Sequence, residues 1–254
     1  MDETKLKELE AQVSVIIKKH GSELLKVWQD RKVVELKDAK EPFTEFDVKT
    51  EEGVRKELSA LLPEAGFLVE EGEDDVKEEY NWAIDPIDQT KNFIGALPLF
   101  YVQVALVYKD TPVLGVIYNP VSDQLFSASE RNGAKVNGKL VTLDSKKSLS
   151  ESIIDIDLGG YGENGDWKLD NFNKLMRSAY RIRCTGASFF PYIVTEVIEG
   201  YVVLGQRVKI TDLMPRIILA TELGLKFEQI KSEDRTISII ASEKVVEEIK
   251  NILS

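Results

Sequence analysis

The chain has 254 residues, of which 43% are hydrophobic and 30% charged, and its formal net charge is −11. This composition is typical of a soluble globular protein, and the length allows one large domain or two coupled lobes. The negative charge argues against a nucleic-acid-binding protein, and no apolar run approaches the roughly 20 residues that span a bilayer. The first residues lack the apolar core of a signal peptide, and the single cysteine, Cys184, excludes a disulfide framework. We therefore expect a cytoplasmic protein.

The first part of the chain predicts two amphipathic helices followed by strands. Apolar residues recur at helical spacing from Leu6 to Trp28, and a second helix is expected from about Asp47 to Leu62. A Pro/Gly segment at 63–66 ends this helix. Strands are then expected at residues 67–69, 80–84, 101–108, 113–118, 124–128 and 135–141.

The second part alternates strands and helices after a polar break at residues 146–151. We place the lobe boundary there, which gives an N-terminal α+β lobe at 1–148 and a C-terminal α/β lobe at 149–254 that completes the site. Strands are expected at residues 153–158, 181–184, 201–204, 209–210 and 236–240, and helices at 169–178, 187–199, 212–223 and 242–253. Helices that alternate with strands favour an α/β fold built from layers.

Residues 85–93 are the most informative segment, because they join a predicted strand to a predicted helix. Asp85 and Asp88 lie three residues apart across a turn and can converge on one hard cation such as Mg²⁺. Pro86 is expected to end the strand, and Thr90 stands where the free N–H groups of a helix start suit a phosphate. Taken alone, the same residues are also compatible with a capped turn.

The charge balance narrows the possible chemistry. An acidic protein repels a phosphate ester unless bound divalent cations reverse the local field. The only histidine, His20, lies in the first predicted helix, far from every other motif. A Ser-His-Asp triad is therefore disfavoured, and a metal-activated water is the favoured nucleophile.

Asp85-Pro86-Ile87-Asp88-Gln89-Thr90-Lys91-Asn92-Phe93 resembles the D-P-[IL]-D-G-T-x-N-F signature of the inositol monophosphatase family, with Gln89 in place of Gly. The resemblance extends from about residue 37 to 224 and includes residues 115–120 and 133–134. It implies a layered αβαβα sandwich of the sugar-phosphatase type. It also implies Mg²⁺-dependent hydrolysis of a small phosphorylated metabolite, and a homodimer.

The resemblance implies ligands for two to three Mg²⁺ ions. Glu70, Asp85 and the carbonyl of Ile87 would hold one ion, and Asp85, Asp88 and Asp212 another. Glu71 would not contact the ion itself but would help to orient the ligand Glu70. Two simpler interpretations stay open, because Glu70 and Glu71 also fit a solvated acidic turn and Asp212 also fits a helix N-cap.

Catalytic roles follow from the same resemblance. Thr90, helped by Glu70, would orient the attacking water, and the N–H groups of Gln89 and Thr90 would bind the phosphate. Thr44 and Asp47 match a Thr-x-x-Asp segment that orients the water and a third ion, although Asp47 is also a candidate N-cap. Lys37 matches a lysine of the neighbouring loop.

Substrate contacts are expected from the second half of the chain. Gly186, Ala187 and Ser188 resemble a substrate-facing turn of the family. Arg207 and Lys209 precede Asp212 in a segment similar to that of archaeal-type relatives, which accept fructose 1,6-bisphosphate as well as inositol phosphate. Cations suit a second phosphate, and exposed basic residues are the alternative interpretation. The expected substrate is inositol monophosphate, fructose 1,6-bisphosphate or both.

Two departures from the family pattern leave alternatives open. If the Gly replaced by Gln89 has a positive φ, Gln costs on the order of 1 kcal/mol there. Met214, Pro215 and Arg216 occupy the small-residue positions of the family's second signature, Trp-Asp-x-Ala-Ala-Gly. One alternative is an adenosine 3′,5′-bisphosphate nucleotidase of the same superfamily. The other is a catalytically impaired paralogue that binds a phosphorylated ligand or a protein partner.

Overall fold

The computed structural model describes residues 1–30, 44–144, 146–159, 162, 164–186, 190–195, 197–205, 209–232 and 235–253. The chain forms two compact units, Met1–Leu140 with Lys209–Glu222, and Val141–Val208 with Leu223–Ser254. The predicted division at 148/149 places the segment 209–222 in the second lobe, whereas its contacts group it with the first unit. The domain boundaries stay a prediction. No helix among the described residues is long and apolar enough to span a bilayer.

The first unit is built on a seven-stranded sheet whose strands follow chain order. Its strands are β1 (Gly66–Val69), β2 (Tyr80–Asp88), β3 (Tyr101–Tyr108), β4 (Thr111–Asn119), β5 (Gln124–Ser129), β6 (Ala134–Val136) and β7 (Lys139–Leu140). β1 and β2 run parallel, and every other neighbouring pair is antiparallel. The strand expected at 135–141 is divided into β6 and β7, because the Asn137-Gly138 turn has positive φ at both residues.

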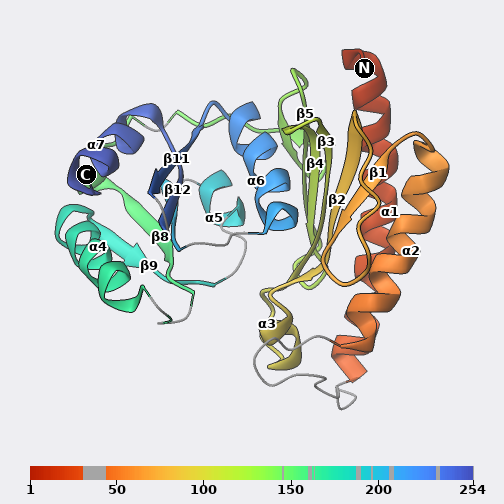
Figure 1. Ribbon diagram of the computed structural model, residues 1–254, viewed down its shortest axis with the longest axis horizontal. Coiled ribbons are helices and arrows are strands. Elements are labelled where there is room, and N and C mark those ends of the chain that lie inside the picture. Colours follow the sequence, from red (N-terminus) through yellow and green to blue (C-terminus); the bar gives the residue numbers. More distant parts are fainter. Residues whose placement is uncertain are drawn as a thin grey trace. The chain divides into compact units, whose positions relative to one another are not determined.

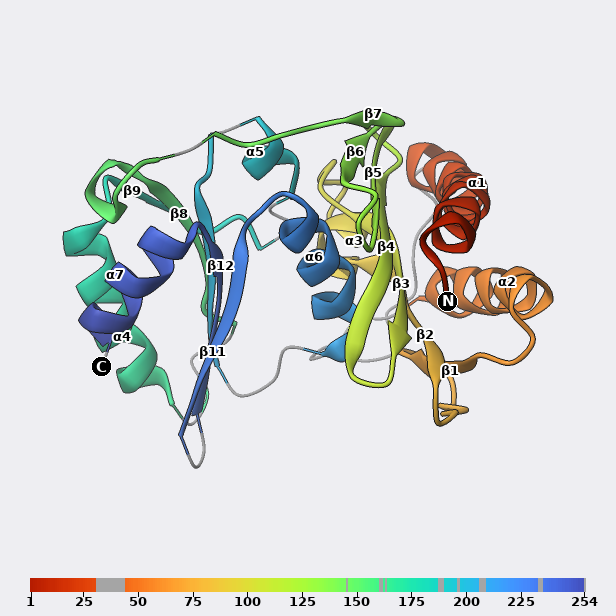
Figure 2. The same cartoon turned by 90° about the horizontal axis from the view of Figure 1, so that it is seen from above.

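Helices cover both faces of this sheet. α1 (Glu3–Asp30) and α2 (Glu45–Leu61) lie on one face, and α6 (Ile210–Glu222) lies on the opposite face, as Figure 2 shows. Apolar residues at helical spacing on α1 and α2 pack against the buried side chains of β2, β3 and β4 in one core. The short helix α3 (Thr90–Ile94) follows directly after β2.

α6 lies close to the sheet because the residues beneath it are small. Ala83 pairs with Ala105, Ala105 with Gly115, and Gly115 with Ala128, so these four residues form one row across β2, β3, β4 and β5. A Cβ atom on Gly115 would lie only 2.5 Å from Cγ2 of Ile218 and 2.9 Å from the carbonyl oxygen of Pro215. Any larger residue at 115 would push α6 away from the sheet.

Two sequence predictions around α6 are wrong. The strand expected at 209–210 is absent, and the helix begins at Ile210 rather than at Asp212. Pro215 therefore lies inside the helix and not in its first turn. The helix tolerates this proline because its buried face, which includes Leu213, Ile218 and Leu219, packs on the sheet.

The second unit contains a five-stranded sheet of order β11-β12-β10-β8-β9. Its elements are β8 (Ile153–Asp157), α4 (Gly165–Ser178), β9 (Arg181–Arg183), α5 (Phe190–Val194), β10 (Gly200–Leu204), β11 (Lys226–Ser232), β12 (Arg235–Ala241) and α7 (Glu243–Leu253), with a 3₁₀ turn at Leu149–Glu151. β11 was not predicted, because it is a half-buried edge strand with three charged residues. Leu175 of α4 and Val245, Val246 and Ile249 of α7 share a core with β8, β10 and β12.

The expected α/β class is confirmed. The first unit has a sheet between helical layers, and the second has a sheet with α4 and α7 packed against it (Figure 1). The two sheets flanked by helices are the arrangement that the sequence predicts.

Candidate active site

Three predicted carboxylates converge at one edge of the first sheet. Glu70 follows β1 and Asp85 lies near the end of β2, and these strands are parallel, so both side chains reach the same edge. Asp212 comes from the first turn of α6. One carboxylate oxygen from each of the three lies within 4.8 Å of the other two. Oxygen donors at this spacing suit a hard cation such as Mg²⁺.

The end of β2 is irregular, and this irregularity places both of its aspartates. The prediction that Pro86 ends the strand is wrong. β2 continues to Asp88, with a register shift between Asp85 and Asp88. The partners of these two residues on β3, Gln103 and Tyr101, are only two positions apart. The extra residue forms a bulge, where the missing N–H of Pro86 breaks no ladder bond.

Asp85 is buried and is held by two donors. Its Oδ2 atom accepts a hydrogen bond of 2.9 Å from Nε2 of Gln103, and its Oδ1 atom accepts one of 3.1 Å from the N–H of Ile87. Gln103 is fully buried, and the sequence prediction missed it. The available signal is a glutamine in an otherwise apolar central strand, which buries an amide only where it finds a partner.

A second missed residue, Glu51 of α2, holds the turn after β1. Its Oε2 atom accepts hydrogen bonds from the N–H groups of Glu70 at 3.1 Å and Glu71 at 2.9 Å, and its Oε1 atom accepts one from Gly72 at 2.8 Å. Glu51 is buried on the helix face that also carries Val54. A carboxylate on the apolar face of a helix is the signal that was available for it. This contact fixes the backbone that presents Glu70.

Thr44, Asp47 and Thr90 form a connected set of hydrogen bonds. Oδ2 of Asp47 accepts from the N–H of Thr44 at 2.7 Å and from its hydroxyl at 2.6 Å, which completes a capping box at the start of α2. Oδ1 of Asp47 lies 3.2 Å from the hydroxyl of Thr90, which also lies 3.0 Å from the carbonyl oxygen of Ile87. Asp47 is thus both the predicted cap residue and a partner of Thr90. Burial raises its pKa, although the hydrogen bonds from Thr44 and Thr90 act in the opposite direction.

Gln89 adopts the backbone conformation that favours glycine. Its φ of 68° and ψ of 53° lie in the left-handed region, immediately before α3. The N–H groups of Asn92 and Phe93 donate to the Gln89 carbonyl, so the turn is closed. A side chain at this φ costs on the order of 1 kcal/mol. The substitution keeps the turn and adds strain to it.

Two cationic side chains from the same region contact the carboxylates. Lys209, which precedes α6, donates from Nζ to Oε1 of Glu70. Arg216 of α6 donates from Nη2 to Oδ2 of Asp88 at 2.7 Å, and both of these side chains are buried. The sequence predicted Lys209 as a substrate contact and did not predict the Arg216–Asp88 pair.

Burial and mutual repulsion shift the pKa of several carboxyl groups. Burial, followed by the charge of Asp88, raises the pKa of Asp212 to about 7, although Arg216 acts in the opposite direction. Burial and the charges of Glu70, Asp212 and Asp88 raise the pKa of Asp85 well above its usual range. Burial, Asp47 and Glu70 raise the pKa of Glu71 to about 7. The cluster therefore carries more negative charge than its protein surroundings balance, and a bound cation would relieve it.

Four predicted site residues, Lys37, Ala187, Ser188 and Arg207, lie outside the described residues. Gly186 belongs to the second unit and has a φ of 57°. The roles of these five residues in substrate binding or loop chemistry stay predictions. His20 does not belong to the cluster of Glu70, Asp85 and Asp212. Its Nε2 atom is 2.9 Å from Oε1 of Glu57, and its ring packs against Gly53 of α2.

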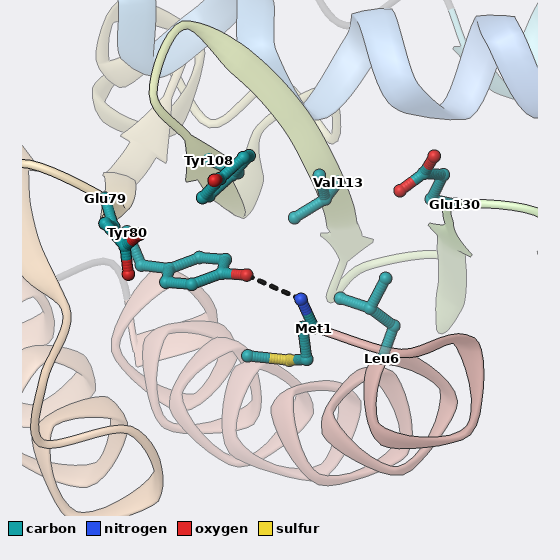
Figure 3. A pocket seen from close by; sticks show the side chains of 7 residues that line it. All are labelled: Met1, Leu6, Glu79, Tyr80, Tyr108, Val113 and Glu130. Carbon is teal, nitrogen blue, oxygen red and sulfur yellow. Dashed lines mark hydrogen bonds between the residues drawn. The ribbon is translucent and has the colours of Figure 1, made fainter.

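A pocket of about 400 Å³ lies at the beginning of β2, the opposite end of the strand from Asp85 and Asp88. Figure 3 shows the ammonium group of Met1 donating to the hydroxyl of Tyr80 there, at 2.8 Å. Glu79 and Glu130 also line this pocket. None of the residues that line this pocket belongs to the group of three converging carboxylates, so the candidate active site is the cluster at the other end of β2.

Comparison with known proteins identifies the family. The family model described as "Inositol monophosphatase family" matches residues 5–251. The chain belongs to the inositol monophosphatase family. An inositol monophosphatase of Dictyostelium discoideum is 35% identical over 169 residues, which cover 64% of this chain and 62% of that relative, so the match spans less than two thirds of the relative's length. An inositol-1-monophosphatase of Mesorhizobium japonicum is 30% identical over 75% of this chain and 73% of its own length.

Solved structures give the same family fold. The extragenic suppressor protein SuhB of Bartonella henselae has a TM-score of 0.85 and is 25% identical, over 96% of this chain and 98% of that one. The Thermotoga maritima inositol monophosphatase has a TM-score of 0.81, with 97% of this chain and 96% of that one covered at 24% identity. The predicted family and fold are confirmed. Both curated relatives, from Dictyostelium discoideum and Mesorhizobium japonicum, are named as phosphatases, which is the enzyme class that the sequence predicts.

Glu51→Gln tests whether the stability of the fold depends on the buried Glu51 carboxylate, which accepts hydrogen bonds from the backbone at residues 70–72. The amide keeps one acceptor and turns an NH₂ group toward backbone donors, so we expect the free energy of unfolding to fall by about 1.5–3 kcal/mol. Urea denaturation measures this change. Glu52→Gln, on an exposed neighbouring residue, is the matched control and should change stability by less than about 0.5 kcal/mol. Equal effects of the two substitutions would contradict the anchoring role of Glu51.

The raised carboxyl pKa values predict how the stability of the metal-free protein depends on pH. Asp212 and Glu71 hold protons in the folded state up to a pKa of about 7, whereas the unfolded chain loses them near its ordinary values of 3.8 and 4.5. The folded state binds more protons across this window, so its stability must fall as the pH rises from about 4 to about 7. We expect the melting temperature in chelator to be lower at pH 8 than at pH 5.5. Asp212→Asn should flatten this profile, and a wild-type melting temperature that rises over the same range would refute the assignment.

Proposed function

We propose that the chain is a metal-dependent phosphatase that hydrolyses a small phosphate monoester. The convergence of Glu70, Asp85 and Asp212 within 4.8 Å carries this proposal. The hydrogen-bonded pair of Thr90 and Asp47 lies at the same end of β2, beside the start of α3. Carboxylates that hold a cation next to a positioned hydroxyl are suited to phosphoryl transfer to water.

Mg²⁺ is the proposed cofactor. The family is metal-dependent, and the donor set consists of carboxylate oxygens, which Mg²⁺ prefers over softer ligands. Glu70, Asp85 and Asp212 would hold it, and the carbonyl of Ile87 is a further candidate ligand. When bound, the ion polarises a phosphoryl oxygen and lowers the pKa of a coordinated water. The family resemblance implies two to three such ions, with Asp88 as a further ligand.

The chain's own groups would position the reactants. The Thr90 hydroxyl donates toward Asp47, which leaves its oxygen lone pairs to accept a hydrogen bond from the attacking water. Thr44 keeps the Asp47 carboxylate in place through two hydrogen bonds. The N–H groups of Gln89 and Thr90, at the start of α3, would donate to phosphate oxygens. Water would attack phosphorus as the bond to the ester oxygen breaks, and its proton would pass to the Glu70 carboxylate. The released ester oxygen would take a proton from solvent, so that the products are an alcohol and inorganic phosphate.

Inositol monophosphate and fructose 1,6-bisphosphate are the proposed substrates. The relative in Mesorhizobium japonicum is named an inositol-1-monophosphatase. A relative in Aquifex aeolicus, 34% identical over 48% of this chain and 46% of its own length, is named a fructose-1,6-bisphosphatase/inositol-1-monophosphatase. Lys209 is half exposed and can exchange its contact with Glu70 for a second phosphate on the substrate. A homodimer and a cytoplasmic location stay predictions.

Phosphate release tests the proposed activity. The full chain with Mg²⁺ should release phosphate from inositol 1-phosphate or fructose 1,6-bisphosphate, and adenosine 3′,5′-bisphosphate tests the nucleotidase alternative. Asp85→Asn keeps the size of the side chain and removes a ligand charge. It should lower kcat/KM by at least about 100-fold, the upper end of what changes to supporting residues cost. Turnover that is equal in the variant would exclude the proposed site, and the absence of turnover with every ester would exclude the proposed activity.

A second candidate function is favoured by the contacts of two substituted positions. Gln89 adds a side chain at the expected phosphate-binding turn, and Arg216 occupies the carboxylate of Asp88. Both changes fit a catalytically impaired paralogue that binds a phosphorylated ligand without hydrolysing it. In that case Mg²⁺ would still bind, but no ester would be turned over.

Gln89→Gly separates the two functions. Glycine adopts the observed φ of 68° without strain, so the free energy of unfolding should rise by about 1 kcal/mol in urea denaturation. For an active enzyme, we expect the wild type and the variant to release phosphate at similar rates. Turnover that is found only in Gln89→Gly would instead establish the impaired paralogue. Gln89→Ala, which removes most of the side chain and keeps the strain, shows whether crowding or strain is responsible.

A further inference from the structure

The buried ion pair between Arg216 and Asp88 changes what the carboxylate cluster can bind. We propose that the Arg216 guanidinium takes the place of a metal ion at Asp88, so that the site binds one divalent ion at Glu70, Asp85 and Asp212. This inference rests on the proposed function for the ion itself. It differs from the two to three ions that the family resemblance implies.

The geometry of the pair supports a permanent contact. Nη2 of Arg216 lies 2.7 Å from Oδ2 of Asp88, and the two side chains are only 4% and 5% exposed. Arg216 follows Asp212 by four residues on α6, so the two side chains project from the same face of the helix. The charge therefore enters the site from the element that also supplies one of the three converging carboxylates.

The guanidinium cannot easily give way to an ion. Arginine stays protonated at every physiological pH, and a buried charge that loses its partner is strongly destabilising. α6 is held close to the sheet at Gly115, where Pro215 and Ile218 leave no space for a Cβ atom. An ion at Asp88 would have to share one carboxylate with this fixed cation.

Lys209 is exposed whereas Arg216 is buried, and this difference determines how many divalent ions the carboxylates can bind. Its side chain is 53% exposed, so it can leave Glu70 for solvent or substrate when an ion binds. The converging carboxylates of Glu70, Asp85 and Asp212, which form the described cluster, then remain available. With Asp88 neutralised by Arg216, these three oxygen ligands suit a single divalent ion.

The position of Arg216 in the sequence explains why the substitution matters. It occupies the sixth position of the segment that corresponds to Trp-Asp-x-Ala-Ala-Gly, where the family signature has glycine. Glycine has no side chain that can reach Asp88. Replacement of glycine by arginine therefore adds a positive charge at the point where a second ion would need a carboxylate.

Metal stoichiometry tests the inference without relying on activity. The full chain, freed of metal with a chelator, is titrated with Mn²⁺ as the probe by equilibrium dialysis, and the bound ions are examined by electron paramagnetic resonance. We expect one bound Mn²⁺ per wild-type chain, with the spectrum of an isolated ion. Arg216→Gly should bind two, with a spectrum of coupled spins, because ions in two-metal sites lie about 3.5–4 Å apart. Arg216→Lys keeps a cation and should stay at one.

The outcomes separate this inference from the proposed function. Two coupled Mn²⁺ ions in the wild type would overturn the inference and leave a metal-dependent phosphatase intact. No bound Mn²⁺ would overturn both. One Mn²⁺ in the wild type and two in Arg216→Gly would support the inference. If circular dichroism shows that Arg216→Gly is unfolded, the wild-type count and Arg216→Lys decide the question.

Discussion

Close packing of α6 against the first sheet is the constraint on which the candidate site depends. Ala83, Ala105, Gly115 and Ala128 form a row of small residues beneath the helix, and the Gly115 position leaves no space for a Cβ atom. The helix can therefore lie near the end of β2 and bring Asp212 within 4.8 Å of Asp85 and Glu70. Larger side chains in this row would separate carboxylates that are 127 residues apart in the sequence, as Asp85 and Asp212 are. The geometry of the candidate site thus depends on four residues that carry no reactive or metal-binding group.

This packing concentrates negative charge around the buried side chains of Asp85 and Asp88. Burial and repulsion raise the pKa of Asp85 and Asp212, so the fold without a cation keeps protons on groups that are ordinarily ionised. The chain offsets part of this cost with Lys209 and Arg216, and the hydrogen bond from Gln103 to Asp85 offsets another part. An ion that binds only the folded state would supply the rest and would couple metal binding to stability. The same charge that repels a phosphate ester is thus what attracts the ion that can bind it.

Local patterns and the family resemblance predicted the parts of the site, whereas long-range contacts were beyond reach of the sequence. Asp85 and Asp88 were predicted from their spacing at a strand-to-helix junction, but Glu70, Thr44 and Asp47 were assigned to the site only by the family resemblance. Glu51, Gln103 and the Arg216–Asp88 pair were missed, because each joins residues 18 to 128 positions apart. Pro86 was predicted to end β2, but the strand continues through a bulge. Pairing with β3 resumes at Asp88, opposite Tyr101. A rule for single residues cannot include the tertiary contact that overrides it.

The two departures from the family signatures differ in physical kind. Gln89 keeps the left-handed backbone of a glycine turn, so its effect is limited to strain and to the space its side chain takes. Arg216 lies within α6 and adds a buried charge that pairs with Asp88. Strain of about 1 kcal/mol can be absorbed by a stable fold, but a fixed cation changes which ligands the site has left. The identity of the residue at position 216 therefore bears more on the chemistry than the more conspicuous change at position 89.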